Sequence, residues 1–105
     1  MPVLLRPVFV FEKYTGESMK QAVDFANVLD AGETVTGGGA TAKRLDTGAS
    51  APEVLTGSPT VVGNTVVYQV TGGTVGISYV IQVSATLSSA ETYMQMVRMD
   101  VVDLP

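Results

Sequence analysis

The chain has 105 residues and a net charge of −4, with no cysteine and no histidine. A chain of this length forms one domain with its own core. Without cysteine or histidine it has no disulfide, and it lacks the usual general base and the commonest transition-metal ligand. The negative charge argues against a nucleic-acid surface. We therefore expect no enzyme, no cofactor, and no catalytic or metal-binding residue.

Charged residues are scarce. They make up 15% of the chain, against about 25% in typical soluble proteins. Two explanations stay open: a strand-rich chain with many valines and threonines, or a surface partly buried in an assembly. We favour the assembly. No apolar run approaches the roughly 18 residues of a membrane span, so no membrane partner is expected.

The first seven residues contain Pro2 and Pro7, which both block regular strand pairing. We expect an extended arm over 1–7 and a single β-domain over 8–105. The arm lacks the basic start and the apolar length of a signal peptide, so we expect a cytoplasmically made protein. Leu4 and Leu5 of the arm are candidate contact residues for a partner.

Alternating and continuous apolar runs predict about seven β-strands, because side chains on a strand alternate between two faces. A single helical turn is expected at 25–29. Gly63–Asn64 and Ser88–Ser89 are two-residue turn signals. In chain order the candidate strands and strand pieces are 8–11, 19–25, 33–36 with a continuation through 42–45, 53–55, 60–62, 66–70, 77–87 and 91–102.

Three consecutive glycines, Gly37 to Gly39, interrupt the third candidate strand. One interpretation is a bulge or a flexible kink, and the other is a phosphate cradle. A cradle would be followed by a Lys-Ser/Thr pair or by the start of a helix, and neither is present. We therefore favour the structural interpretation.

The stretch 72–102 organises the chain as a closing hairpin of two long strands. In its first strand the odd-numbered residues from Ile77 to Leu87 are apolar, which indicates a half-buried strand. Gly72 and Gly76 precede Tyr79, and a Gly-x-x-Tyr entry is typical of an immunoglobulin-like sandwich. We expect Tyr79 to form a tyrosine corner, with its hydroxyl bonded to backbone around 73–76. The predicted fold is an all-β, immunoglobulin-like antiparallel sandwich.

Met94 and Met96 lie on the face of the last strand opposite Val97, Met99 and Val101, where solvent is expected. Methionine is adaptable and is favoured on contact surfaces. Two interpretations stay open: a partner interface at Met94 and Met96, or a strand buried on both faces by the N-terminal arm.

Acidic residues near the turn at 30–32 include Asp24, Asp30 and Glu33, and Asp100 and Asp103 lie near the C-terminus. A calcium loop needs several oxygen ligands at close, regular spacing. The Asp-x-Asp-x-Asp pattern is absent, so solvated charges beside turns are the favoured interpretation.

Two stretches resemble a family of small tailed-phage proteins, the phage fibre-tail adaptors. Residues 23–35 read VDFANVLDAGETV, with an aromatic strand end, a leucine, and then Gly-Glu-Thr before a β-branched residue. Residues 70–81 read VTGGTVGISYVI and are similar to the family's Gly-Gly…Gly…Tyr entry to a strand. The resemblance carries over no catalytic or metal residue.

The resemblance implies a non-enzymatic virion structural protein, made in the host cytoplasm, that links the tail to a fibre or a neighbouring tail component. Its expected partners are other virion tail or fibre proteins and copies of itself. The alternative is an immunoglobulin-like surface module that binds carbohydrate or Ca²⁺. Exposed aromatic residues in a groove would favour that alternative, and the chain has no tryptophan.

Overall fold

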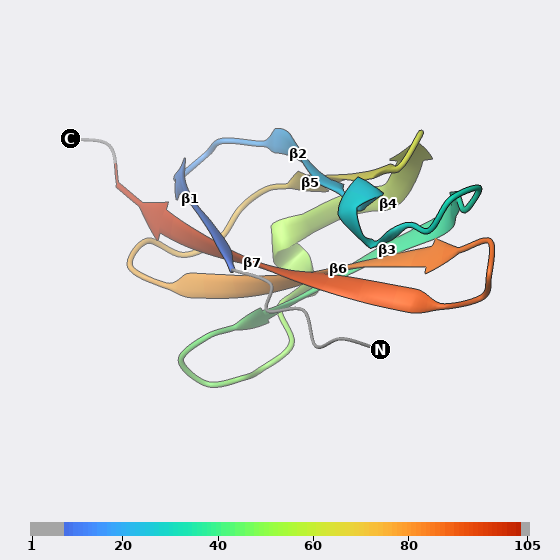
Figure 1. The fold of residues 1–105 in the computed structure, drawn as a ribbon. Coiled ribbons are helices and arrows are strands. Elements are labelled where there is room, and N and C mark those ends of the chain that lie inside the picture. Colours follow the sequence, from blue (N-terminus) through green and yellow to red (C-terminus); the bar gives the residue numbers. More distant parts are fainter. Residues whose placement is uncertain (1–7, 104–105) are drawn as a thin grey trace.

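A computed structural model describes residues 8–103 and contains seven strands and two short 3₁₀ helices (Figure 1). The arm predicted over 1–7, with Leu4 and Leu5, lies outside the described residues. The elements in chain order are β1 (Phe9–Tyr14), β2 (Met19–Asp24), η1 (Ala26–Val28), β3 (Val35–Arg44), η2 (Pro52–Val54), β4 (Leu55–Val62), β5 (Thr65–Val70), β6 (Ser78–Leu87) and β7 (Thr92–Val102).

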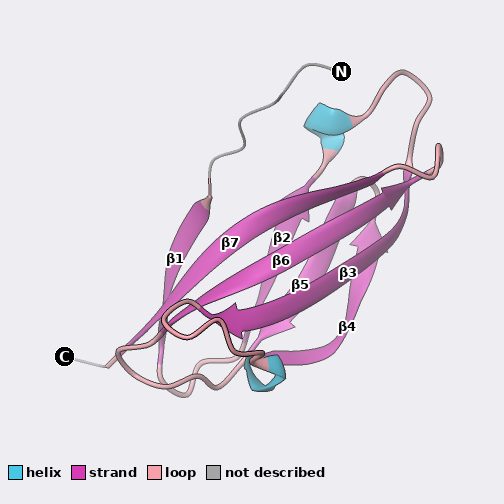
Figure 2. Ribbon diagram, turned by 90° about the horizontal axis from the view of Figure 1, so that it is seen from below, coloured by secondary structure: helices cyan, strands magenta, loops and turns pink. Residues whose placement is uncertain are grey.

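The strands form two sheets that face each other, which confirms the predicted seven-strand sandwich. One sheet has the order β1-β7-β6-β3 and the other the order β2-β5-β4; Figure 2 shows the four-stranded sheet in front of the three-stranded one. The core lies between them and is built from the alternating apolar residues of β5, β6 and β7. The members of these strands that are at most 4% exposed are Val66, Tyr68, Val70, Tyr79, Ile81, Val83, Ala85, Leu87, Val97, Met99 and Val101.

The first strand differs from its prediction in length and in direction of pairing. It starts one residue later than expected and runs to Tyr14 rather than ending at Phe11. It pairs in parallel with β7, with Phe11 opposite Met99, whereas every other strand pair in the two sheets is antiparallel. The part of β1 beyond its predicted end includes Lys13, which is fully buried.

Three smaller expectations at element ends are wrong. A strand piece was predicted at 53–55, but the 3₁₀ helix η2 extends to Val54 and β4 begins only at Leu55. Proline at the first helical position favours this helical start. The β6–β7 turn spans 88–91 rather than two residues, and Ala90 takes a left-handed φ of 72° in it. The third strand starts at Val35 and runs unbroken to Arg44, with a register shift between Val35 and Gly37.

The triple glycine lies inside β3, and its middle member faces the other sheet. Gly38 pairs with the buried Ala85. A Cβ atom built on Gly38 would lie 2.9 Å from Val66 Cγ1 of β5. Real Cβ atoms essentially never come this close to a neighbour, so the glycine allows the two sheets to approach at this point.

We predict that Gly38→Ala lowers the free energy of unfolding by about 1–3 kcal/mol, the usual cost of overpacking a core. Gly37→Ala is the matched control, because its nearest contact would be Thr86 Cβ at an ordinary 3.8 Å. The control should be neutral, or stabilising by less than about 1 kcal/mol, because alanine restricts the unfolded chain. Denaturant midpoints measure both changes, and equal midpoints for the two variants would contradict the packing argument.

Candidate functional site

The outer face of the four-stranded sheet carries Met94 and Met96. Burial alternates along β7, with Val97, Met99 and Val101 buried on the inner side. Met94 and Met96 therefore point away from the core, on the outer face of the four-stranded sheet. The Met94 side chain is 52% exposed and Met96 is half-buried.

Three neighbouring cross-strand rows on this outer face contain no charged residue. Each row runs from β7 across β6 to β3 and takes one outward-facing residue from each strand. We call the nine residues together the methionine face; they are Thr92, Thr86 and Gly37, then Met94, Ser84 and Gly39, then Met96, Gln82 and Thr41. Since Gly39 and Ser84 are small, the Met94 side chain projects farther from the sheet than its two neighbours in the row.

A charged boundary follows the last uncharged row. The next row consists of Arg98 on β7, Val80 on β6 and Lys43 on β3, so it has a cation at each end. Arg98 Nε lies 2.8 Å from Asp100 Oδ1, and Ser78 Oγ donates to the same oxygen at 2.6 Å. The Ser78 hydroxyl and the Arg98 guanidinium together hold the pKa of Asp100 below its ordinary value.

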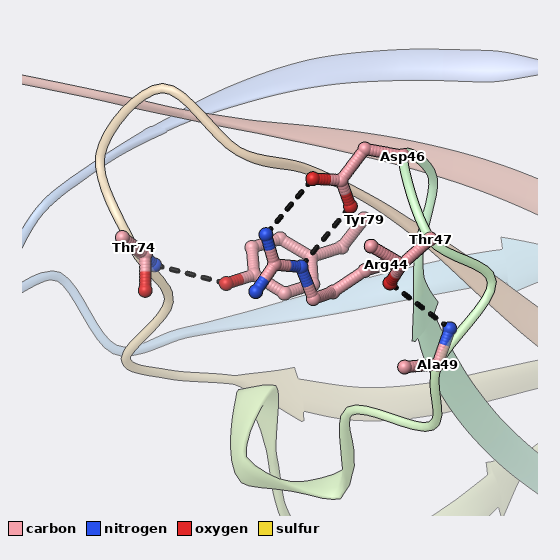
Figure 3. Close-up of polar contacts among 6 residues, drawn as sticks. All are labelled: Arg44, Asp46, Thr47, Ala49, Thr74 and Tyr79. Carbon is pink, nitrogen blue, oxygen red and sulfur yellow. Dashed lines mark hydrogen bonds and ion pairs between the residues drawn. The ribbon is translucent and has the colours of Figure 1, made fainter.

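The remaining residues that the sequence singled out lie at the end of the sandwich where β5 crosses to β6. We call residues 71–77 the corner loop. Tyr79 is 2% exposed, and its hydroxyl oxygen accepts a hydrogen bond from the Thr74 backbone N–H at 3.0 Å (Figure 3). Gly72 and Gly76 both have positive φ, 59° and 83°. These three residues shape the fold and do not contribute to the methionine face.

Figure 3 also shows the chain that leaves β3 beside the corner loop. Arg44 pairs with Tyr79 across the sheet. Its guanidinium makes two hydrogen bonds to the Asp46 carboxylate, at 3.1 and 2.8 Å. The hydrogen bonds from Arg44 lower the pKa of Asp46. Both side chains are substantially exposed, so this pair contributes little to stability.

Two residues at the corner loop were missed by the sequence reasoning. Lys13 is fully buried, and its ammonium donates to the carbonyls of Gly72 at 2.7 Å and Tyr14 at 3.1 Å. Gly73 has φ 92°, and a Cβ there would lie 2.7 Å from Val101 Cγ2. The sequence offered no signal for the inward position of Lys13, because residues 8–11 are apolar at both parities.

The acidic residues considered for calcium are used locally in the turns. Asp24 accepts a hydrogen bond from the Ala26 backbone at 2.9 Å, and Glu33 accepts one from the Asp30 backbone at 2.7 Å. Within residues 8–103, no group of three or more acidic, histidine or cysteine side chains is placed to hold a metal ion. No helix in the same part of the chain is long and apolar enough to cross a membrane.

Replacing Tyr79 by phenylalanine should lower the free energy of unfolding by about 1 kcal/mol, because the Thr74 N–H loses its acceptor while the ring packing stays. Denaturant midpoints of wild type and variant measure the effect. Coinciding midpoints would show that the hydrogen bond to the corner loop contributes nothing.

Asp100→Asn tests the charged boundary through pH. The lowered pKa means that the Asp100 carboxylate stabilises the fold above its unfolded value of 3.8, and that this contribution is lost as pH falls through the folded pKa. At pH 7 the free energy of unfolding of the wild type should exceed that of the variant by less than about 1 kcal/mol. Unfolding followed from pH 7 to pH 2 should show the gap close below the unfolded pKa; a gap that is constant with pH would contradict the prediction.

Comparison with solved structures supports the fold. A structure described as an IG27 protein domain matches with a TM-score of 0.52 and 13% sequence identity, covering 95% of this chain and 96% of that one. At this identity the match shows the fold alone, an immunoglobulin-like sandwich. No curated protein matches the chain.

Comparison with family models identifies a phage tail component. The model described as "Podophage GP4 fiber-tail adaptor protein gp77" matches residues 13–99, a range from β1 to β7 that includes the corner loop and the methionine face. This range is most of the chain, and it includes both stretches on which the resemblance to fibre-tail adaptors was based. The chain therefore belongs to the podophage GP4 fiber-tail adaptor family, which gives it a structural adaptor role in the virion.

Proposed function

We propose that this chain is a non-enzymatic adaptor that links the phage tail to a fibre or to a neighbouring tail component through the methionine face. One observation carries the proposal: three adjacent rows of the outer sheet surface contain no charge and present the half-exposed Met94. The family match supports a structural role, and the methionine face supplies a surface for it.

An exposed sheet face in an isolated sandwich normally carries charged or polar side chains. On the methionine face the only large side chains are Met94, Met96 and Gln82. Methionine is unbranched and polarizable, so it adapts its shape to an irregular partner surface. Burying each methionine fully would contribute about 1.5–3 kcal/mol. Repeated over several copies in a particle, this contribution is enough to direct assembly.

The charged boundary gives the contact an orientation. Lys43, Arg98 and Asp100 border the uncharged rows at the end nearer the corner loop. A partner that covers the methionine face would meet these charges at its rim, where complementary charges select the partner and fix its position. The partners proposed are other tail or fibre proteins and further copies of this chain, assembled in the host cytoplasm.

We expect the double variant Met94→Glu with Met96→Glu to fold but to stop joining tail particles, because two carboxylates would be buried without partners. The measurement is the fraction of protein that co-sediments with particles when the variant complements a phage lacking the wild-type protein. Circular dichroism and a denaturant midpoint establish that the variant is folded.

The matched control is Val62→Glu with Val75→Glu. These valines are 64% and 44% exposed, and both lie away from the methionine face, on β4 and in the corner loop. The control adds the same two charges and should still co-sediment. If the methionine variant unfolds, the methionines belong to the core; if it assembles as the control does, the contact lies elsewhere.

A further inference from the structure

The outer edge of β3 has unpaired main-chain groups. β3 is the last strand of the four-stranded sheet and pairs with β6 on one side only (Figure 2). On its other side, the loop that connects β3 to η2 makes main-chain hydrogen bonds to the end of β3. The Ala51 N–H donates to the Ala42 carbonyl at 2.9 Å, and the Arg44 N–H donates to the Ala49 carbonyl at 2.9 Å.

These two hydrogen bonds show which residues of β3 direct their main-chain N–H and C=O groups toward the outer edge of the sheet. In an antiparallel strand, alternate residues direct both their N–H and their C=O to the same side. Ala42 and Arg44 face the outer edge, so Gly38 and Ala40 face it as well. No hydrogen bond joins the main-chain groups of Gly38 or Ala40 to any described residue on that side.

Natural sheets protect such an edge with proline, inward-pointing charge or a bulge. The sister edge strand β4 has a register irregularity between Thr56 and Thr60, and this stretch contains Pro59. From Gly37 to Thr41, β3 has neither a proline nor a charged residue, and its register shift with β6, between Val35 and Gly37, comes before Gly38 and Ala40. The segment therefore leaves main-chain donors and acceptors open to an added strand.

Two hollows adjoin the same edge, one on each face of β3. The inner hollow, about 280 Å³, is lined by residues that include Ala40, Pro52 and Leu55. The outer hollow, about 210 Å³, is lined in part by Val80 and Gln82. A strand added beside β3 would direct its side chains alternately toward these two faces.

We propose that the edge at Gly38 and Ala40 binds an extended segment of another polypeptide by strand addition, with an aliphatic side chain of that segment entering the inner hollow. Main-chain hydrogen bonds supply the affinity in this mode of recognition, and pockets for alternate side chains supply the selectivity. The inference is carried by backbone geometry, and it does not rest on the function proposed for the methionine face.

A second copy of this chain fits the edge poorly. Antiparallel pairing of β3 with the β3 strand of another copy, centred on this segment, would bring three glycines and Ala40 to the site. None of these has a side chain larger than methyl, so both hollows would stay unfilled. The larger aliphatic side chain that the inner hollow accepts must come from a different segment.

The test uses a nine-residue peptide in which threonine and leucine alternate between two terminal lysines, added to the full chain. Amide hydrogen exchange followed by NMR should slow at least about tenfold at Gly38 and Ala40 when the peptide saturates, since the edge becomes paired. A peptide with its bonding-side amides N-methylated should give no protection. A peptide with alanine in place of leucine should bind about tenfold more weakly, because it leaves the inner hollow empty.

Two variants separate the edge from its hollow. Ala40→Pro removes the Ala40 N–H from the outer edge, at a position where an edge strand tolerates proline. It should weaken peptide binding at least about tenfold. Ala40→Leu fills the inner hollow and keeps the backbone, so it should abolish the preference for the leucine peptide over the alanine peptide. This second variant decides the matter if the proline variant does not fold.

Several outcomes would overturn the proposal. Gly38 and Ala40 amides that already exchange slowly in the free chain would show that the edge is covered. Protection by the peptide at another strand edge, or undiminished binding to a folded Ala40→Pro, would place the site elsewhere. A concentration-dependent dimer that Ala40→Pro abolishes would assign the edge to a second copy of the chain.

Discussion

The hydrogen bond between the Tyr79 hydroxyl and the Thr74 N–H holds the corner loop against the start of β6. This loop is one of the connections that carry the chain between the two sheets, here from β5 to β6. Two further contacts converge there: the Lys13 ammonium on the Gly72 carbonyl, and Gly73 against Val101. A polar bond, a buried cation and a residue without Cβ thus join β1, β6 and β7 at one end of the sandwich.

This constraint extends to the methionine face through register. Once Tyr79 is held inward, alternation places every second residue of β6 on the outside. The pairing of β6 with β7 then sets Ser84 beside Met94 and Gln82 beside Met96. A slip of one residue would turn Met94 and Met96 inward and expose Val97 and Met99. The surface proposed for the partner is therefore specified by the buried half of the same strands.

Local periodicity in the sequence was enough for these predictions: alternation indicated the sandwich and the closing hairpin, and helical spacing indicated the turn after Phe25. It could not predict the parallel pairing of β1 or its extension through Lys13, since pairing with β7 joins residues almost a whole chain apart and a lysine is expected in solvent rather than in a core. The role of Gly38 was hidden for a related reason. Its requirement for glycine comes from Val66 on the opposite sheet, and a distance between sheets leaves no periodic trace in the chain.

The small residues of β3 link the interior to the two proposed surfaces. Gly38 lets the sheets approach, while Gly39, its neighbour on the outer side, keeps the methionine face low around Met94. With so few side chains, this part of β3 also leaves its outer edge unshielded. A valine or threonine at these positions would favour the strand by propensity, but it would crowd Val66 on the inner side or Ser84 on the outer. Packing on both faces of the sheet thus accounts for the triple glycine, despite its low intrinsic strand propensity.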